Sequence, residues 1–133
     1  MFIEKFSKEA YSLMRIVAGF LFFCHGAQKI LGIFGGYREP GGTAELLSLR
    51  GAAGLLELIG GALIAIGLFT PWTAFILSGE MAFAYFISHF MRDGHFWPIQ
   101  NRGESAVLYC FLFLFIASKG AGVWSIDHRL GRS

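Results

Sequence analysis

Polar side chains interrupt four stretches of the chain that are otherwise apolar, and chemistry could take place at these side chains. If the stretches cross a bilayer, an ionised group near its centre costs about 2.5 to 3.5 kcal/mol on insertion scales. Such a group is therefore normally paired, neutral or turned toward a cavity, where it can bind a polar ligand or exchange protons with it. The interrupting residues are Arg15, His25, Gln28, Lys29, Glu57, Glu80, His89 and Glu104.

Residues of the first two stretches are expected to meet at one level. Counted from the stretch ends nearest the two long loops, Lys29 lies about 8 Å deep, Glu57 about 9 Å and His25 about 13 Å. His25, Gln28 and Lys29 share one helix face, because residues three and four apart are neighbours. We predict an ion pair between Lys29 and Glu57, extended by the other two side chains. Two interpretations remain open: the pair fixes helix register, or it lines a ligand pocket.

Glu80 is expected about 18 Å from the loop-side surface, near the middle of the apolar layer. A carboxyl group at this depth should be neutral unless Arg15 or Lys29 reaches it. It could serve proton-coupled quinone chemistry, or it could simply be satisfied by a backbone carbonyl. His89 follows nine residues later, which is a rotation of about 180° on an α-helix, so the two side chains are not expected in one site.

The second long loop carries a further group of polar and aromatic residues. Asn101 with Glu104 three residues later matches a capping box, with Asn in the usual Ser or Thr position. This pattern predicts that Asn101 caps the last helix. It does not explain why His89, His95 and Trp97 lie at the same rim, since an interfacial aromatic belt accounts only for the tryptophan.

The composition indicates the solvent around these elements. Of the 133 residues, 55% are apolar and 15% are charged, and the mean hydropathy is +0.57, unlike an ordinary water-soluble domain. The apolar stretches cover residues 11–34, 51–69, 72–91 and 103–119, and the fourth spans a core of about 30 Å only by borrowing a turn. We predict an all-α single domain over residues 1–133, an antiparallel four-helix transmembrane bundle in contact with membrane lipid. A multidomain enzyme is excluded by length, and nucleic-acid binding by a dispersed net charge of +2.

Four crossings would place both termini on one side, and the short joint at Thr70 and Pro71 predicts a hairpin between the second and third helices. Lys and Arg near the helix ends are slightly more numerous on the terminal side, so we predict cytoplasmic termini and an uncleaved first helix. The second stretch is rich in Gly and Ala, which predicts close helix approach. We expect it at the centre of the bundle; contact between copies in a homo-oligomer is the alternative.

Other cofactor chemistry has little support. Cys24 and Cys110 lack the spacing of a redox pair and are interpreted as buried thiols, although a contact between them stays open. A bis-histidine haem is not predicted, because His25 and His89 differ in depth by about 9 Å. No zinc pattern, phosphate loop or nucleophile elbow occurs, so no metal site is predicted.

The order of several short motifs carries a family resemblance. The chain resembles the DoxX family of small bacterial membrane proteins from about residue 11 to 128. The ordered pair Asn-x-Gly-Glu and Gly-x-Gly-x-x-Ser-x-Asp is the most specific part. The matching residues are Arg15, Gly26 and Lys29; Glu57, Gly60 and Gly61; Gly67 to Pro71; Met81 and His89; Pro98, Asn101, Gly103 and Glu104; and Gly120 to Asp127.

The resemblance implies a multi-pass protein of the bacterial inner membrane, linked to quinone oxidoreductase activity. No redox group of its own is apparent, so electrons would come from a partner protein, with quinone as the bound cofactor. The first reading is a subunit of a membrane redox system; the alternative is a non-enzymatic bundle that stabilises a partner complex or carries a small molecule. The predicted binding pocket comprises His25, Lys29, Glu57, His89, Asn101 and Glu104, and the predicted structural polar network comprises Arg15, Glu80 and Asp127.

Overall fold

The computed structural model describes residues 1–132, and every regular element within them is helical. A short 3-10 helix, η1, precedes the long helix α1, and the last long helix, α6, is followed by the short α7. The third long helix changes its winding midway, from α-helix to π-helix and back. The elements are η1 (Phe2–Phe6), α1 (Ser7–Leu31), α2 (Leu49–Ile66), α3 (Thr70–Ala84), η2 (Tyr85–Phe90), α4 (Met91–Asp93), α5 (Pro98–Asn101), α6 (Glu104–Lys119) and α7 (Ile126–Arg129).

The helix ends follow local signals in the sequence. Gly32 and Gly67 take the left-handed conformation at the C-terminal ends of α1 and α2, which glycine adopts without steric cost. The side chain of Ser48 caps α2 by accepting a hydrogen bond from the Gly51 amide. α1 therefore stops before the predicted end at residue 34, and the hairpin joint lies at residues 67–69 instead of at Thr70 and Pro71, which begin α3.

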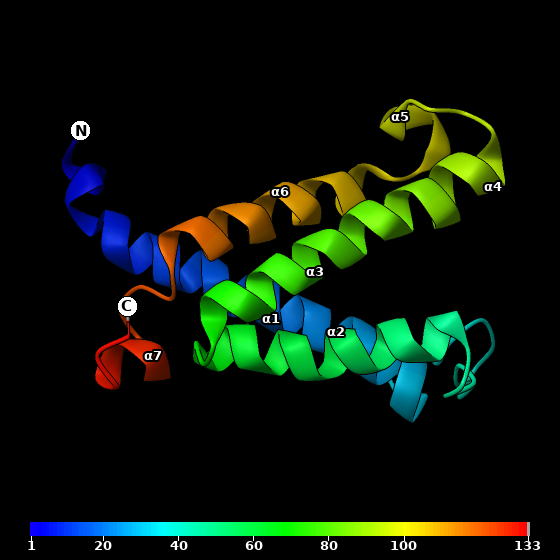
Figure 1. The fold of residues 1–133 in the computed structure, drawn as a ribbon, viewed down its shortest axis with the longest axis horizontal. Helices are drawn as coiled ribbons and strands as arrows, with labels where there is room; N and C mark the ends of the chain where they lie inside the picture. Colours follow the sequence, from blue (N-terminus) through cyan, green and yellow to red (C-terminus); the bar gives the residue numbers. More distant parts are fainter. Residues whose placement is uncertain (133) are drawn as a thin grey trace.

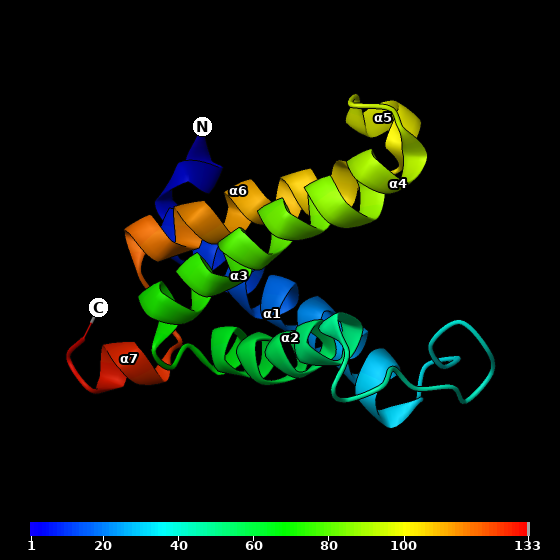
Figure 2. The ribbon, with the colours of Figure 1, turned by 45° about the vertical axis from the view of Figure 1, so that its right-hand side comes forward.

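The long helices form two antiparallel pairs, α1 with α2 and α3 with α6 (Figure 1). Both termini lie at the same end of the molecule as the α2–α3 hairpin, and the two long loops lie at the other (Figure 1). The pairs are close at the hairpin end and diverge toward the loops, which the turned view also shows (Figure 2). The loop-side end is thus where cavities can form between the pairs.

The contact between α1 and α2 depends on glycine. A Cβ atom on Gly26 would lie 2.2 Å from the Leu58 amide nitrogen, and one on Gly61 would lie 2.3 Å from the Phe23 nitrogen. These distances leave no space for a side chain, so the two backbones touch directly. The predicted close approach of the second helix is present, and it is made within the chain.

The second helix is central by its packing partners, because it packs against both α1 and α3, but it contributes little to the apolar core. Most of the buried apolar core comes from α1, α3 and α6, and α2 contributes only Ile64 to it. On its other side α2 exposes Leu55 and Ile59. The physical reason is that α2 meets its neighbours through small residues, such as Gly61 against α1 and Gly60 against Leu77 of α3, so it adds few large side chains to the core.

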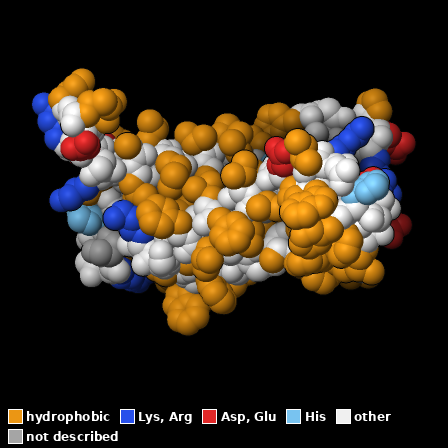
Figure 3. Space-filling model, turned by 90° about the horizontal axis from the view of Figure 1, so that it is seen from above, with side chains coloured by type: hydrophobic (Ala, Val, Ile, Leu, Met, Phe, Trp, Pro, Cys, Tyr) orange, Lys and Arg blue, Asp and Glu red, His pale blue; other side chains and the backbone are white. Residues whose placement is uncertain are grey.

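Within residues 1–132, three helices are long and apolar enough to cross a membrane: Phe2–Leu31, Leu49–Ile66 and Thr70–Asp93. The fourth predicted span is a helix, but α6 has only 16 residues and rises about 24 Å, less than a hydrocarbon core of about 30 Å. Apolar side chains cover the middle of the face seen from above, and Lys and Arg gather toward both ends (Figure 3).

Candidate functional site

An ion pair between α1 and α2 forms the centre of the site. Lys29 Nζ donates to both carboxylate oxygens of Glu57, at 2.9 Å each. The side chains are only 20% and 5% exposed, so the pair is shielded from the surroundings. Gly54, one turn from Glu57, packs against the Lys29 stem, and this close backbone contact sets the register that brings the two charges together. The predicted pair is therefore present.

Glu80 joins this pair from α3. Its carboxyl group lines the same cavity as Lys29 and Glu57 and lies within electrostatic range of both. Its Oε1 is buried and has no hydrogen-bond partner among the described residues. Glu80 thus lies at the Lys29 site. The sequence had predicted it in a structural polar network with Arg15 and Asp127.

Two adjoining cavities lie on either side of the ion pair, between the diverging helix pairs. The larger, about 310 Å³, contains Glu80 and ends outward on the exposed apolar side chains of Ile76 and Phe83. The smaller, about 170 Å³, contains His25 and His89. The two cavities share the walls formed by Lys29, Arg50, Glu57, Ala84 and Ser88.

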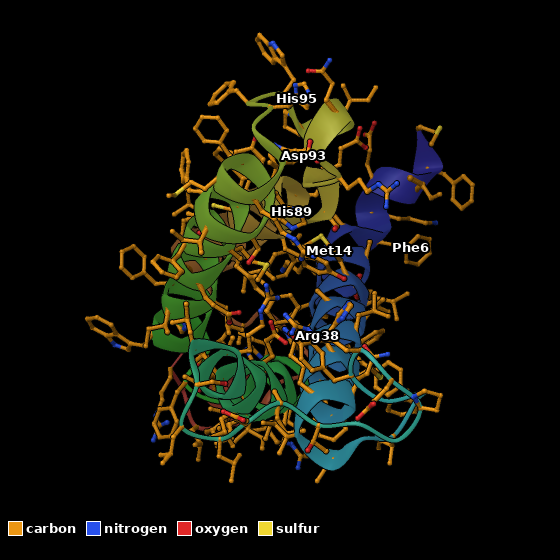
Figure 4. All side chains as sticks on the ribbon, turned by 90° about the vertical axis from the view of Figure 1, so that its right-hand side faces the viewer. Phe6, Met14, Arg38, His89, Asp93 and His95 are labelled. Carbon is orange, nitrogen blue, oxygen red and sulfur yellow. The ribbon has the colours of Figure 1, made fainter. Side chains whose placement is uncertain are left out.

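The π-helix brings His89 to the smaller cavity. A π-turn takes up one extra residue, which corresponds to about 100° of rotation on an α-helix, so His89 turns back toward the face that carries Glu80. The two residues line different cavities, as expected, but these cavities adjoin. Seen from the loop side, His89 points into the space between the helix pairs and His95 lies at the outer edge (Figure 4).

Asn101 organises the second long loop instead of capping α6. Its amide nitrogen donates to the carbonyl of His95 at 2.8 Å and to the Tyr85 hydroxyl at 3.1 Å, and its oxygen accepts the Gly103 amide at 2.9 Å. The predicted capping box is wrong, because Pro98 starts the short helix α5, which ends at Asn101, and Gly103 occupies the N-cap of α6.

The remaining predicted pocket residues divide between the site and its surroundings. His25 lines the smaller cavity. His89 is held in place by a 3.2 Å contact between its Nδ1 and the Asn101 carbonyl. Glu104 is exposed at the start of α6 and lines neither cavity. Gln28 turns away and donates to the Phe34 carbonyl at 3.1 Å.

Arg50 and Ser88 are polar residues that line both cavities and were not predicted from the sequence. Arg50 precedes Glu57 by seven residues, which is two helical turns and therefore the same face. That spacing could have identified it, but the arginine was counted only as a loop charge. Nothing in the sequence signals Ser88, because its position depends on the π-turn.

A second polar cluster lies at the opposite end and joins α1 to the C-terminal segment. Arg15 is fully buried and donates five hydrogen bonds to backbone carbonyls, which belong to Ile64 and Ala65 of α2 and to Ala121, Val123 and Trp124 of the segment. Asp127 accepts the amides of Phe69 and Thr70 at 3.0 and 2.8 Å, where α3 begins. This cluster ties α1, α2, α3 and the C-terminal segment together, and neither Arg15 nor Asp127 lines the two cavities described above.

The two cysteines line neither of the two cavities. Cys24 and Cys110 are free thiols, and the sulfur of Cys110 lies 3.6 Å from the Ser78 hydroxyl. In the described part of the chain, no group of three or more His, Cys, Asp or Glu side chains could hold a metal ion.

The fold and the site define a class of protein: an all-helical membrane protein with an ion-paired cluster between its apolar helices. The DoxX family model matches residues 10–90, and the chain belongs to the DoxX family. An uncharacterized protein of Haemophilus influenzae is 39% identical over an alignment covering 96% of this chain and 95% of that relative. No solved structure matches the chain. The membership confirms the resemblance found in the sequence.

Proposed function

We propose that this protein is a quinone-binding subunit of a membrane redox system. The observation that carries the proposal is the larger cavity, about 310 Å³, which combines mostly apolar walls with Lys29, Glu57 and Glu80. Ligand pockets are typically 300 to 1,000 Å³ and combine apolar walls with a few polar groups. A quinone would match such a pocket, since its carbonyl oxygens accept hydrogen bonds and its tail is apolar.

The residues present fit such a head group. Lys29 has three N–H donors, and Glu57 takes two of them, which leaves one for a quinone carbonyl. The Oε1 atom of Glu80, buried without another partner, can share a hydrogen bond with a ligand in the same cavity. Ile76 and Phe83 at the mouth are exposed and would lie beside the tail. When bound, the quinone supplies two-electron redox chemistry, and the electrons come from a partner protein.

The setting of this proposal is the bacterial inner membrane, with α6 as the fourth crossing. Gly103 and Gly120 border the 16 residues of α6, and local thinning of the bilayer or extension into these borders compensates for a short span. Lys5, Lys8 and Lys119 lie on the terminal side, which favours cytoplasmic termini.

A non-enzymatic bundle is the second candidate. It is favoured by the Lys29–Glu57 pair itself, because both carboxylate oxygens are already satisfied at 2.9 Å without any ligand. In that case the pair fixes the register of α1 and α2, and the protein supports a partner complex or carries a small molecule.

Gentle solubilisation followed by mass spectrometry of the extracted small molecules separates the two candidates. Co-purified quinone, with binding of a short-chain quinone that Lys29→Met weakens, supports the first. Lys8→Met is the matched control, since Lys8 lies on the exposed part of α1 at the other end. Protein that contains no quinone, binds none when it is added, and is isolated with a partner supports the second.

A further inference from the structure

The carboxyl groups of Glu57 on α2 and Glu80 on α3 line one cavity together with Lys29. Two carboxylates are both acceptors, so a hydrogen bond between them requires one shared proton. One proton also balances the charge, because a single ammonium, that of Lys29, pairs with the cluster. A second ionised carboxylate would be uncompensated between apolar helices, where charge is costly.

Arg50 lines the same two cavities as Glu57, but of the salt bridges in the described chain none joins it to either carboxyl group. The other titratable or charged groups around the cluster come from every element packed against it. They are His25 on α1, His89 on η2, Tyr109 on α6, and Arg92, Asp93 and Arg102 near the second loop.

A third cavity lies next to the smaller one, near the second long loop. It has a volume of about 580 Å³ and is lined by polar residues, among them Arg92, Asp93 and Arg102. Ser88 and His89 belong both to this cavity and to the smaller cavity that contains Glu57. The third cavity, His89 and the carboxyl pair therefore follow one another from the loop side inward.

The hydrogen bonding of His89 suits transfer along this path. Its Nδ1 contacts the Asn101 carbonyl at 3.2 Å, and because a carbonyl only accepts, Nδ1 carries the proton in this contact. The Nε2 lone pair of the neutral ring is then free to accept a proton, and the cation that results can release it again. Asn101 is itself held by Tyr85 and by loop carbonyls, so the ring orientation is fixed.

We propose that Glu57 and Glu80 form a proton-binding site that exchanges with loop-side water through His89. A proton moves from water in the 580 Å³ cavity to Nε2 of His89, then through the 170 Å³ cavity to the carboxyl pair, and leaves by the reverse path. No electron transfer is involved, and the site exists whether or not a quinone binds. It would give any ligand in the larger cavity a proton from the loop side of the membrane.

Infrared spectroscopy of the protein in lipid nanodiscs without quinone tests both parts of the proposal. The shared proton gives a carboxylic acid C=O band in the wild type that is altered in Glu57→Gln and in Glu80→Gln. Absence of such a band, or a band unchanged by both substitutions, overturns the proton site.

The rate at which this band exchanges after a switch to deuterated buffer tests the path. His89→Gln keeps a donor for the Asn101 carbonyl but does not titrate, and we expect exchange to slow by about tenfold or more. His95→Gln is the matched control, because His95 is exposed on the same loop and lines none of the three cavities. Equal exchange in wild type and His89→Gln, or equal slowing in the control, overturns the path. These samples contain no quinone, so the outcome is independent of the quinone-binding test.

Discussion

Replacement of Arg15 by Met should destabilise the protein strongly, and the structure sets the size of the effect. The side chain is fully buried, and its three nitrogens reach five carbonyls at 2.7 to 3.4 Å. A hydrogen bond to a charged group contributes about 1.5 to 3 kcal/mol. Two of the five acceptors keep another donor: Ser12 for Val123 and the Gly67 amide for Ile64. Loss of two of the remaining bonds alone lowers the free energy of unfolding by about 3 to 6 kcal/mol.

Arg15→Lys is the informative companion variant. Lysine keeps the charge but has three donors on one nitrogen and lacks the planar fork, so it cannot reach α2 and residues 121–124 together, and we expect an intermediate loss. Unfolding is followed by circular dichroism during titration with a denaturing detergent, and release of the C-terminal segment by limited proteolysis. An Arg15→Met protein with the wild-type midpoint and an uncleaved segment would refute this account of the cluster.

Three further predictions concern packing, capping and charge. Gly26→Leu should separate α1 from α2 and lower the unfolding midpoint, whereas Gly79→Leu should not, because no atom lies within 4 Å of a Cβ built there; midpoints in the same detergent titration decide this. Asp127→Ala removes the acceptor for two amides at the start of α3 and should cost about 1 to 2 kcal/mol, measured by the same titration and by faster proteolysis of residues 120–132. Glu57→Gln should destabilise the protein less than Glu57→Gln combined with Glu80→Gln, because in the single variant Glu80 can still pair with the Lys29 ammonium. Equal losses from the single and double variants in equilibrium unfolding would contradict this.

The ion pair could be predicted from the sequence because only the depth of each residue along its helix had to be known. Depth along a helix follows from a fixed rise per residue, and the cost of an unpaired charge in an apolar layer demands a partner at the same depth. Lys29 and Glu57 satisfied both conditions. The glycine-rich face of α2 was readable for the same reason, since the absence of side chains at helical spacing permits only close packing.

The rest of the site depends on rotation and on loops, which the sequence leaves undetermined. Glu80 reaches Glu57 only because α3 crosses α2 at a particular angle, and the π-turn that redirects His89 has no sequence signature. The misplaced cap at Asn101 has a similar cause. Pro98 opened a short helix of its own, and the polar side chain that would have capped α6 satisfied the loop carbonyls of His95 and Phe96 instead.

The two polar clusters lie at opposite ends of the molecule and have different roles. At the terminal end, Arg15 and Asp127 hold α1, α2, α3 and the C-terminal segment together through backbone groups, and the helix pairs are close there (Figure 1). At the loop end the pairs diverge and three cavities adjoin. A ligand can therefore enter beside Lys29 without breaking the contacts that fix the fold. Substitutions at the terminal cluster should alter unfolding and leave ligand affinity per folded molecule unchanged, whereas Glu80→Gln should do the reverse, since an amide can still hydrogen-bond to Glu57 but carries no titratable proton.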